Sequence, residues 1–449
     1  MESAIRAAEA APSADRGGRA RLIVMPYHCA EEETLDLTRL AELQRRKLSM
    51  MLDEIRRSNP FYRAKLGGSD SPRAKIDIGE LPFTSRAEIE ADQLRHPPYG
   101  TNLTYPLERY TRLHQTSGSQ GQPLRWLDTP ESWARWRVHW GTIFHAAGID
   151  KSDRIAVPFT FGPFIGFWGA FESAAALGHF VMPLGGMTTV ARLRHLIEHR
   201  ATVVCCTPTY ALRMIEVASA ESIDLAGSSV RALIVAGEPG GSIPSTRMRI
   251  EEGFGARVFD HAGMTEMGAW GFECLEAPGG MHVNESEFIA EVVEPGGSGL
   301  ASDGSPGELV LTNLGRWCSP LIRYRTGDLV RLVRSRCACG RWFARAVGGI
   351  LGRADDMLVV RGNNVFPSMI ESIVRRFPEI VEFQIVVRGE PPLGTLEVII
   401  EPVAGADEAM IVQRLVSTIR DECHFQPVVR AGQNLPRFEM KAKRVVRTS

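Results

Sequence analysis

The middle of the chain alternates short apolar runs with stretches of helical pattern, and this alternation limits the possible folds more than any other feature. The apolar runs cover residues 153–159, 178–184, 201–208 and 230–241. Strands separated by helices of this length predict parallel sheets that are covered by helices on both faces. The expected fold class is therefore α/β, built from packed β-sheets and helices.

The pattern changes after Gly307. Residues 307–314 and 328–333 are expected to form antiparallel strands that end a large domain. The order strand, helix, strand, strand, helix then predicts a small α+β unit, ferredoxin-like in type. Its segments are residues 358–367, 368–377, 382–387, 395–403 and 409–422. We expect a large domain over residues 1–354 and a small, mobile domain over residues 355–449.

Helical spacing is also clear near the start of the chain. Between residues 34 and 66, Leu48, Met51, Leu52 and Ile55 fall on one face of a helix. Residues 1–25 are rich in alanine, carry mixed charges and lack an apolar signal-peptide core, so they are expected to form a flexible tail.

The composition excludes several classes of protein. The chain has 449 residues, with 52 Lys and Arg against 53 Asp and Glu, so its charge gives no reason to expect nucleic acid or a membrane surface as a partner. No apolar run is long enough to span a bilayer. The eight cysteines come without a secretion signal, which favours thiols and metal ligands over disulfides. We therefore expect a cytoplasmic protein.

One hydroxyl-rich segment suits a polyphosphate. Residues 116–123 read Thr-Ser-Gly-Ser-Gln-Gly-Gln-Pro. Glycines let backbone N–H groups turn inward, and hydroxyls add further donors. No Gly-Lys-Ser/Thr sequence follows, so the segment is not a Walker loop. Taken alone, it could equally be a linker or a polar turn.

Four later segments remove that ambiguity by their order. They are Asp-His-Ala-Gly-Met-Thr-Glu at 260–266, Tyr-Arg-Thr-Gly-Asp at 324–328, the stretch from Gly352 to Pro367, and Lys-Ala-Lys-Arg at 441–444. Together with the hydroxyl-rich loop, they resemble the motifs of the acyl-adenylate-forming superfamily over nearly the whole chain. Residues 60–62, 81–83, 320–325 and 362–371 resemble the phenylacetate–CoA ligase branch in particular.

The resemblance implies an acid–CoA ligase that uses ATP, Mg²⁺ and CoA. A carboxylate that attacks the α-phosphate of ATP brings anion to anion, so the site must neutralise charge. Lys441, Thr265 and Glu266 are the expected catalytic residues, with Glu266 helping to hold Mg²⁺. The expected ATP- and AMP-binding residues are Thr116, Ser117, Gly118, Ser119, Gly121, Gly237, Glu238, Pro239, Asp260, His261, Ala262, Gly263, Met264, Thr265, Asp328 and Arg353.

The resemblance also implies a hinge at Asp355, with Gly362 and Asn363 lining the path of the CoA thiol after the small domain rotates. Lys443 could take the role of Lys441.

The sequence departs from the usual motifs of the superfamily at two places. Ala262 replaces the aromatic residue that usually flanks the adenine, and Leu124-Arg125 replaces a proline–lysine pair after the loop. Arg125 could supply the missing cation.

An aromatic run suggests the pocket for the acid. Phe161, Phe164 and Phe167, interleaved with glycines, could form a flat apolar slot that ends near Gly263. The same aromatics could instead belong to an ordinary core. The run carries no charge, which favours a neutral ring, so phenylacetate, benzoate and anthranilate types all remain open.

Four residues suggest a structural zinc site. Cys337 and Cys339 form a tight pair, and Cys274 and His282 lie upstream. Three thiolates and one imidazole suit tetrahedral Zn²⁺ without an open position. Unrelated, reduced residues are the alternative, whereas Cys205 and Cys206 lie in an apolar strand and are expected to be core.

Two other functions share most of these motifs. The chain could load an aryl acid onto a carrier protein instead of CoA. It could also be a non-catalytic nucleotide-binding protein of the same fold, against which Asp328, Glu266 and Lys441 argue.

Overall fold

The computed structural model describes residues 26–67, 77–116, 122–294, 296–354, 356–360, 363–388, 395–438 and 442–448. The predicted tail, residues 1–25, lies outside these ranges, as do Ser117, Gly118, Ser119, Gly121, Asp355, Gly362 and Lys441. For Asn363 the backbone is described and the side chain is not.

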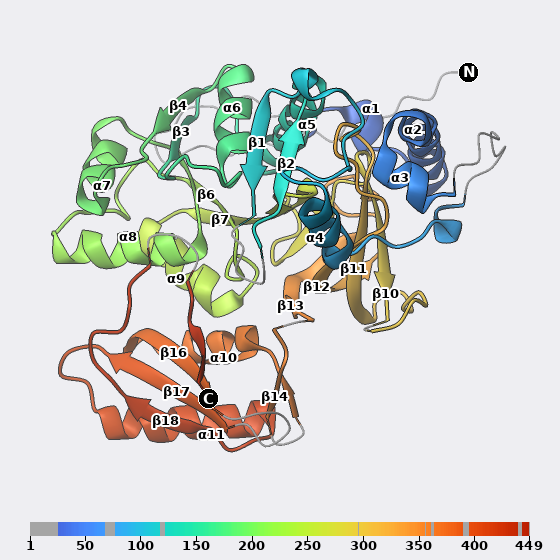
Figure 1. Ribbon diagram of the computed structural model, residues 1–449. Helices are drawn as coiled ribbons and strands as arrows, with labels where there is room; N and C mark the ends of the chain where they lie inside the picture. Colours follow the sequence, from blue (N-terminus) through green and yellow to red (C-terminus); the bar gives the residue numbers. More distant parts are fainter. Residues whose placement is uncertain are drawn as a thin grey trace, which may run out of the picture.

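The predicted alternation of strands and helices builds one half of an 11-stranded sheet. The neighbouring strands β4, β3, β5, β6 and β7 are parallel, and each connection between them contains a helix (Figure 1). The strands are β3 (Arg154–Val157), β4 (Phe180–Pro183), β5 (Val203–Cys206), β6 (Ala232–Ala236) and β7 (Arg257–Met264); the helices are α6 (Trp168–Ala176), α7 (Thr189–Glu198), α8 (Pro208–Ala220) and α9 (Pro244–Phe254).

Alternate residues of these strands face two different cores, as expected of a sheet that is covered on both sides. Ile155 and Cys205 pack in a cluster with α6 and α5 (Pro130–Ala146). Ala156 and Cys206 pack in a second cluster with residues of α7, α8 and α9. Both cysteines are buried, which confirms their expected place in the core.

The other half of the sheet is antiparallel. β8 (Gly268–Phe272) pairs with β7, and β9, β13, β12, β11 and β10 follow in that order. The expected strands at 307–314 and 328–333 are confirmed as β11 (Pro306–Asn313) and β12 (Tyr324–Val333). The remaining bounds are β9 (Gly280–Val283), β10 (Phe288–Val293) and β13 (Arg345–Arg353), with a separate hairpin of β1 (Arg112–Gln115) and β2 (Arg125–Asp128).

The helical stretch near the start is one long helix followed by a short one, rather than a single helix. α2 (Leu37–Ser58) ends before Asn59, whose side chain caps α3 (Pro60–Lys65) by accepting from Tyr62 N. Proline is well placed in the first turn of a helix and poorly placed inside one, so the break falls there. The four residues of the predicted apolar face are buried. Short helices α1 (Ala30–Glu33), η1 (Ile78–Glu80), α4 (Arg86–Arg95) and η2 (Leu107–Arg109) complete this region.

The C-terminal unit has its own sheet and its own core. Its four strands run in the order β18, β17, β16, β19, with α10 and α11 in the same core cluster. Residues 358–365 differ from the expected single strand: they form a separate hairpin, β14 with β15. The bounds are β14 (Leu358–Val360), β15 (Asn363–Val365), α10 (Pro367–Val374), β16 (Ile380–Arg388), β17 (Thr395–Pro402), α11 (Glu408–Cys423), β18 (Val428–Ala431) and β19 (Val445–Thr448).

The C-terminal unit lies against α8 and α9 of the large sheet domain (Figure 1). Ser245 Oγ donates to the carbonyl of Ser372 across this boundary, at 3.1 Å. Arg437 forms ion pairs both with Glu401 of its own unit and with Glu216 of α8. These contacts across the boundary are polar, which is typical of interfaces between domains of one chain.

Candidate active site

Five of the predicted site residues lie at the carboxyl ends of two parallel strands. β6 ends at Ala236, directly before Gly237, Glu238 and Pro239, and β7 ends at Met264, directly before Thr265 and Glu266. Because β6 and β7 are neighbours in the sheet, the two loops lie side by side. Ligands of open α/β sheets bind at this edge.

Asp260 and His261 are buried on β7. Ser242 Oγ donates to Asp260 Oδ2 at 2.5 Å. Burial, and to a lesser extent the nearby Glu273, raise the pKa of Asp260 to about 7. The imidazole Nδ1–H of His261 donates to the carbonyl of Gly271 at 2.6 Å, and its ring packs on Trp140 at 4.7 Å between centroids. Burial lowers the pKa of His261 to about 4, so this ring is neutral at pH 7.

Ala262 and Gly263 differ in their surroundings. Ala262 is buried in the core cluster that contains Trp270 and supplies no ring to flank an adenine. Gly263 is exposed, and a Cβ atom there would lie 3.1 Å from the carbonyl oxygen of Gly268. A side chain at this position would therefore press on the backbone of β8.

The turn that carries Thr265 and Glu266 is held by residues that the sequence analysis missed. Arg316 Nη1 donates to the carbonyls of both residues, at 2.7 and 2.9 Å. The hydroxyl of Tyr324 donates to Glu266 Oε1 at 3.3 Å. Burial raises the pKa of Tyr324 well above its usual value, so the hydroxyl stays protonated. The sequence does mark Arg316, because it is the one charged residue between Leu309 and Ile322, in a largely apolar stretch that is expected to be buried.

Asp328 and Arg353 are brought together as a cross-strand pair. They face each other in the register of β12 and β13, and Arg353 Nη1 lies 3.0 Å from Asp328 Oδ1. Asp328 is 6% exposed, whereas the Arg353 side chain is 35% exposed. The two predicted nucleotide ligands thus form one unit directly before the predicted hinge.

Thr116 marks the base of the predicted phosphate loop. Its N–H donates to the carbonyl of Leu124 at 2.9 Å, and its Oγ1 accepts from Leu124 N at 3.0 Å. These bonds extend the β1–β2 hairpin and close the loop, whose other predicted ligands lie outside the described residues. Arg125, proposed as a substitute cation, donates from Nη1 to the carbonyl of Pro98 at 3.2 Å.

Glu238 joins the nucleotide loop to the C-terminal unit. Its carboxylate accepts from Thr209 N and from Ala442 N, both at 2.8 Å. Burial raises the pKa of this carboxyl. Ala442 directly follows Lys441, so the segment that carries the predicted catalytic lysine contacts the loop predicted to border the adenine. Lys443 is exposed.

The predicted aromatic slot is only partly assembled. The Phe161 ring packs edge-on against Trp168 at 4.7 Å between centroids, and Phe167 is buried at 4% exposure. Phe164 is 37% exposed. Phe159, which the sequence analysis did not single out, contacts both Phe161 and Phe167, at 5.6 and 5.8 Å between centroids. It belongs to the same apolar run, so its aromatic character was the available signal.

A cavity of about 140 Å³ lies beside this run. Thr207 and Tyr210 of its wall flank Thr209, which contacts Glu238. A cavity of roughly 150 Å³ accommodates benzene, so this one has the size of a single aromatic ring. The lining residues are Pro158, Phe159, Thr160, Phe167, Arg192, Cys206, Thr207 and Tyr210.

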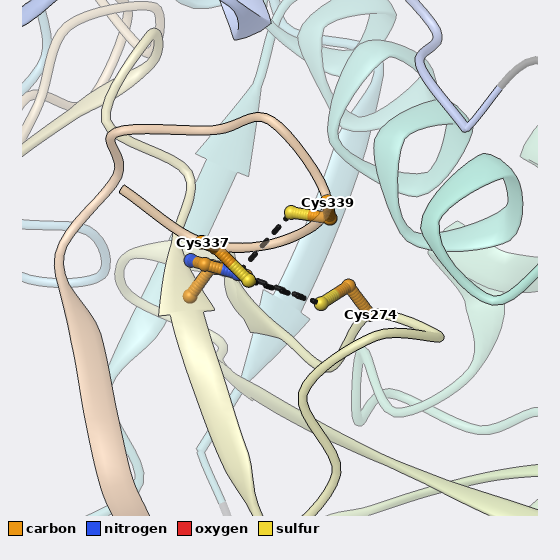
Figure 2. A group of neighbouring side chains, drawn as sticks. Cys274, Cys337 and Cys339 are labelled. Carbon is orange, nitrogen blue, oxygen red and sulfur yellow. Dashed lines mark hydrogen bonds between the residues drawn. The ribbon is translucent and has the colours of Figure 1, made fainter. Parts of the chain in front are cut away.

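The four predicted metal ligands converge in one cluster (Figure 2). Cys274 Sγ lies 3.8 Å from Cys337 Sγ and 3.6 Å from His282 Nε2, and Cys339 Sγ also lies 3.6 Å from His282 Nε2. Tetrahedral Zn²⁺ bonds of about 2.3 Å to sulfur and 2.0 Å to nitrogen separate two sulfurs by about 3.8 Å, and sulfur from nitrogen by about 3.5 Å. His282 Nδ1 faces the carbonyl of Phe343 at 3.2 Å, so Nε2 is the ring nitrogen that would bind a metal. The cluster therefore has the geometry to hold zinc.

The raised pKa of Asp260 predicts a pH-dependent stability. Its carboxyl has a folded-state pKa of about 7 against a usual 3.8, so its favourable contribution is complete below pH 3.8 and is lost as pH rises through 7. Between pH 4 and pH 8, the wild-type protein is expected to lose on the order of 2–4 kcal/mol of unfolding free energy through this carboxyl. We expect Asp260→Asn not to show this loss. Urea unfolding of both proteins at pH 4 and pH 8 measures this difference, and parallel pH dependences of the two proteins would contradict it.

Among the residues that the structure describes, no helix has the length and the apolar character needed to cross a membrane.

Two family models match the chain. One describes the AMP-binding enzyme and matches residues 113–315, and the other describes the AMP-binding enzyme C-terminal domain and matches residues 362–448.

Curated relatives cover most of the chain. The phenylacetate–coenzyme A ligase of Thermus thermophilus is 32% identical over 83% of this chain and 83% of its own length. The enzyme of the same name from Escherichia coli is 31% identical over 82% of this chain and 84% of its own.

The chain is also similar to solved structures of a 2-hydroxyisobutyryl-CoA ligase, at 26% identity. The TM-score is 0.89 for the postadenylation state with bound 2-HIB-AMP, over 95% of this chain and 94% of that one. It is 0.72 for the thioesterification state with 2-HIB-AMP and CoA, over 98% and 96%. The fold, the ordered motifs and these relatives agree, and the chain belongs to the AMP-binding enzyme family, in its phenylacetate–CoA ligase-like branch, as an AMP-forming acid–CoA ligase.

Proposed function

We propose that the acid activated by this ligase is a small aromatic carboxylic acid of the phenylacetate, benzoate or anthranilate type. The ring-sized cavity walled by Phe159 and Phe167 carries this proposal. Flat aromatic walls favour a planar ligand. The names of the two curated relatives, both phenylacetate–CoA ligases, support the same class of acid.

The reaction has two steps. In the first, a carboxylate oxygen of the acid attacks the α-phosphorus of ATP, and the bond to pyrophosphate breaks. In the second, the CoA thiolate attacks the acyl carbon, AMP leaves, and the thiol proton is released to solvent. Each step passes through a state with extra negative charge, so both require fixed donors and cations.

The first step would take place at the turn after β7. Thr265 would donate to the α-phosphate, and Glu266, oriented by the Tyr324 hydroxyl, would hold Mg²⁺. A bound Mg²⁺ would neutralise charge on the phosphates. The Asp328–Arg353 pair suits the ribose, because a carboxylate can accept from both ribose hydroxyls while the guanidinium holds it in place.

We further propose that residues 355–449 rotate about Asp355 between the two steps. The higher TM-score to the postadenylation state than to the thioesterification state supports an adenylation-type arrangement here. The hydrogen bond from Ala442 to Glu238 supports it too, because it holds the Lys441 segment at the nucleotide loop. Rotation would release Lys441 and bring Gly362 and Asn363 to the path of the CoA thiol.

Zinc is proposed as a structural cofactor. Three thiolates and one imidazole would fill its four positions, so it would take no part in the chemistry. The match between the ligand separations and a tetrahedral ion supports this assignment.

The test is a mass-spectrometric assay with ATP, Mg²⁺ and CoA. The panel holds aryl and arylalkyl acids, short aliphatic acids and 2-hydroxyisobutyrate. We expect an aryl-CoA product, with kcat/KM for the best aryl acid at least tenfold above that of any aliphatic acid. Preference for an aliphatic or hydroxy acid would overturn the aromatic proposal. Accumulation of aryl-AMP with CoA present would point instead to a carrier-protein acceptor.

A further inference from the structure

Arg316 is a fully buried charge at the centre of the site. It lies in the connection between β11 and β12 and is 2% exposed. The rings of Trp126 and Trp136 lie 5.6 and 5.9 Å from its guanidinium carbon. A buried charge is tolerated only when it is paired and hydrogen-bonded, so the partners of Arg316 indicate what it does.

Its first partner is Asp128, the last residue of β2. Arg316 Nε and Nη2 donate to the two oxygens of Asp128 at 2.8 and 2.7 Å, in a bidentate pair, and Asp128 has no exposed surface. β2 follows the predicted phosphate loop and pairs with β1, which precedes it. The guanidinium is therefore fixed relative to the hairpin that carries the loop.

Its second partner is the catalytic turn. The remaining nitrogen, Nη1, donates to the carbonyls of Thr265 and Glu266 at 2.7 and 2.9 Å. Because the guanidinium is planar and rigid, fixing one side of it fixes the other. Asn313 reinforces the arrangement: its Nδ2 donates to the carbonyl of Met267, and its Oδ1 accepts from Arg316 N at 3.0 Å.

Arg316 thus connects two segments whose separation matters for adenylation. The phosphate loop would hold the β- and γ-phosphates, and the turn would hold the α-phosphate and Mg²⁺. An error of about 1 Å in the position of a reacting group can cost roughly a hundredfold in rate. The guanidinium contacts the hairpin on one side and the turn on the other.

We propose that Arg316 is a positioning residue for adenylation, which sets the Thr265–Glu266 turn at a fixed distance from the phosphate-loop hairpin. The proposal rests on the proposed roles of Thr265 and Glu266. It predicts that Arg316 acts on the rate and the Mg²⁺ dependence of the first step, and not on the binding of the acid.

The primary test is Arg316→Lys, which keeps the charge and removes the planar fork. We expect kcat of acid-dependent pyrophosphate release to fall about a hundredfold. The Mg²⁺ concentration at half-maximal rate is expected to rise, while KM for the acid changes less than about threefold. Thioester formation from supplied acyl-AMP is expected to stay within about threefold of the wild-type rate.

A matched control is Arg231→Lys. Arg231 also pairs with one carboxylate, Asp153, through two nitrogens and donates to one carbonyl, Gly148 O at 2.8 Å. It directly precedes β6, at the opposite end of the strands from the site. We expect kcat of this variant to stay within about twofold of wild type, with a smaller loss of unfolding temperature, since the Arg231 side chain is 27% exposed.

Asp128→Asn is the second variant, expected to lower kcat about tenfold with the same split between kcat and KM. Wild-type kcat and Mg²⁺ dependence in Arg316→Lys would overturn the proposal, as would losses that only track the folded fraction. Failure of both variants to fold would mean that Arg316 serves stability alone, and would also overturn the proposal.

A wild-type protein that releases no pyrophosphate with any acid would overturn the proposed function instead. The inference would then be decided by calorimetry of Mg²⁺-dependent ATP binding, which Arg316→Lys should weaken and Arg231→Lys should not.

Discussion

Replacing Glu266 with glutamine is expected to lower the rate of acid-dependent pyrophosphate release by about 10²–10³-fold. The amide keeps the shape of the side chain and loses its negative charge, and Mg²⁺ prefers carboxylate oxygens. The Tyr324 hydroxyl, held at 3.3 Å from Glu266 Oε1, can still donate to the amide oxygen. The turn should therefore keep its place, because Arg316 holds it through backbone carbonyls rather than through this side chain.

The decisive measurement is a Mg²⁺ titration of pyrophosphate release. A weaker metal site predicts that excess Mg²⁺ restores part of the rate, whereas ATP binding without metal stays close to that of the wild type. Glu251→Gln serves as the control. Glu251 lies on α9, and its Oε1 accepts from the N–H of Val258 at the start of β7, the opposite end of that strand from Glu266. Unchanged activity of Glu266→Gln at limiting Mg²⁺ would show that Glu266 holds no metal.

Local pattern was enough to predict the large sheet. The strands at 153–159 and 230–241 are short apolar runs between helices, and such runs are buried on both faces whatever their neighbours are. The pattern did not separate α2 from α3, although Asn59 and Pro60 carry both a cap and a break. It also merged β14 and β15 into one strand, because two short paired strands look like a longer one when only composition is read.

Candidate site residues could be named from the sequence where they lie in a recognisable motif, and the structure shows which of them meet. Asp328 and Arg353 come from separate motifs and meet as a pair. Arg316 could not be placed in the same way, since its partner Asp128 lies 188 positions away and neither residue belongs to a motif. Phe164 shows a different limit of the sequence analysis. It was predicted to line the acid pocket and is exposed, whereas Phe159, which was not predicted, lines the cavity. The aromatic character of a residue does not tell which way its ring points.

The proposed zinc cluster joins segments that are far apart in the chain. Cys274 follows β8, His282 lies on β9, and Cys337 and Cys339 lie between β12 and β13. Arg341, buried beside Cys339, pairs with Glu33 of α1, and the Tyr27 hydroxyl donates to the carbonyl of Cys339 at 2.5 Å. The N-terminal segment is therefore anchored on the same loop as the thiolates.

Removing one ligand should then destabilise the whole large domain. We expect Cys339→Ser to lose zinc and more than about 4 kcal/mol of unfolding free energy, since metal binding is coupled to the folding of its ligands. Plasma mass spectrometry measures the zinc content, and urea unfolding measures the stability. Cys423→Ser is the control, because Cys423 is also buried but lies in the C-terminal core; it should keep about one zinc per chain.

The same variant separates a structural metal from a catalytic one. A structural zinc predicts that folded Cys339→Ser molecules, assayed at low temperature, release pyrophosphate at close to the wild-type rate. A rate that falls in step with zinc content in fully folded protein would mean that the metal takes part in the reaction. A wild-type protein purified without zinc, whose stability does not change on adding zinc or a chelator, would mean that the four residues form a reduced thiol cluster that holds its geometry through Arg341 and the Phe343 carbonyl alone.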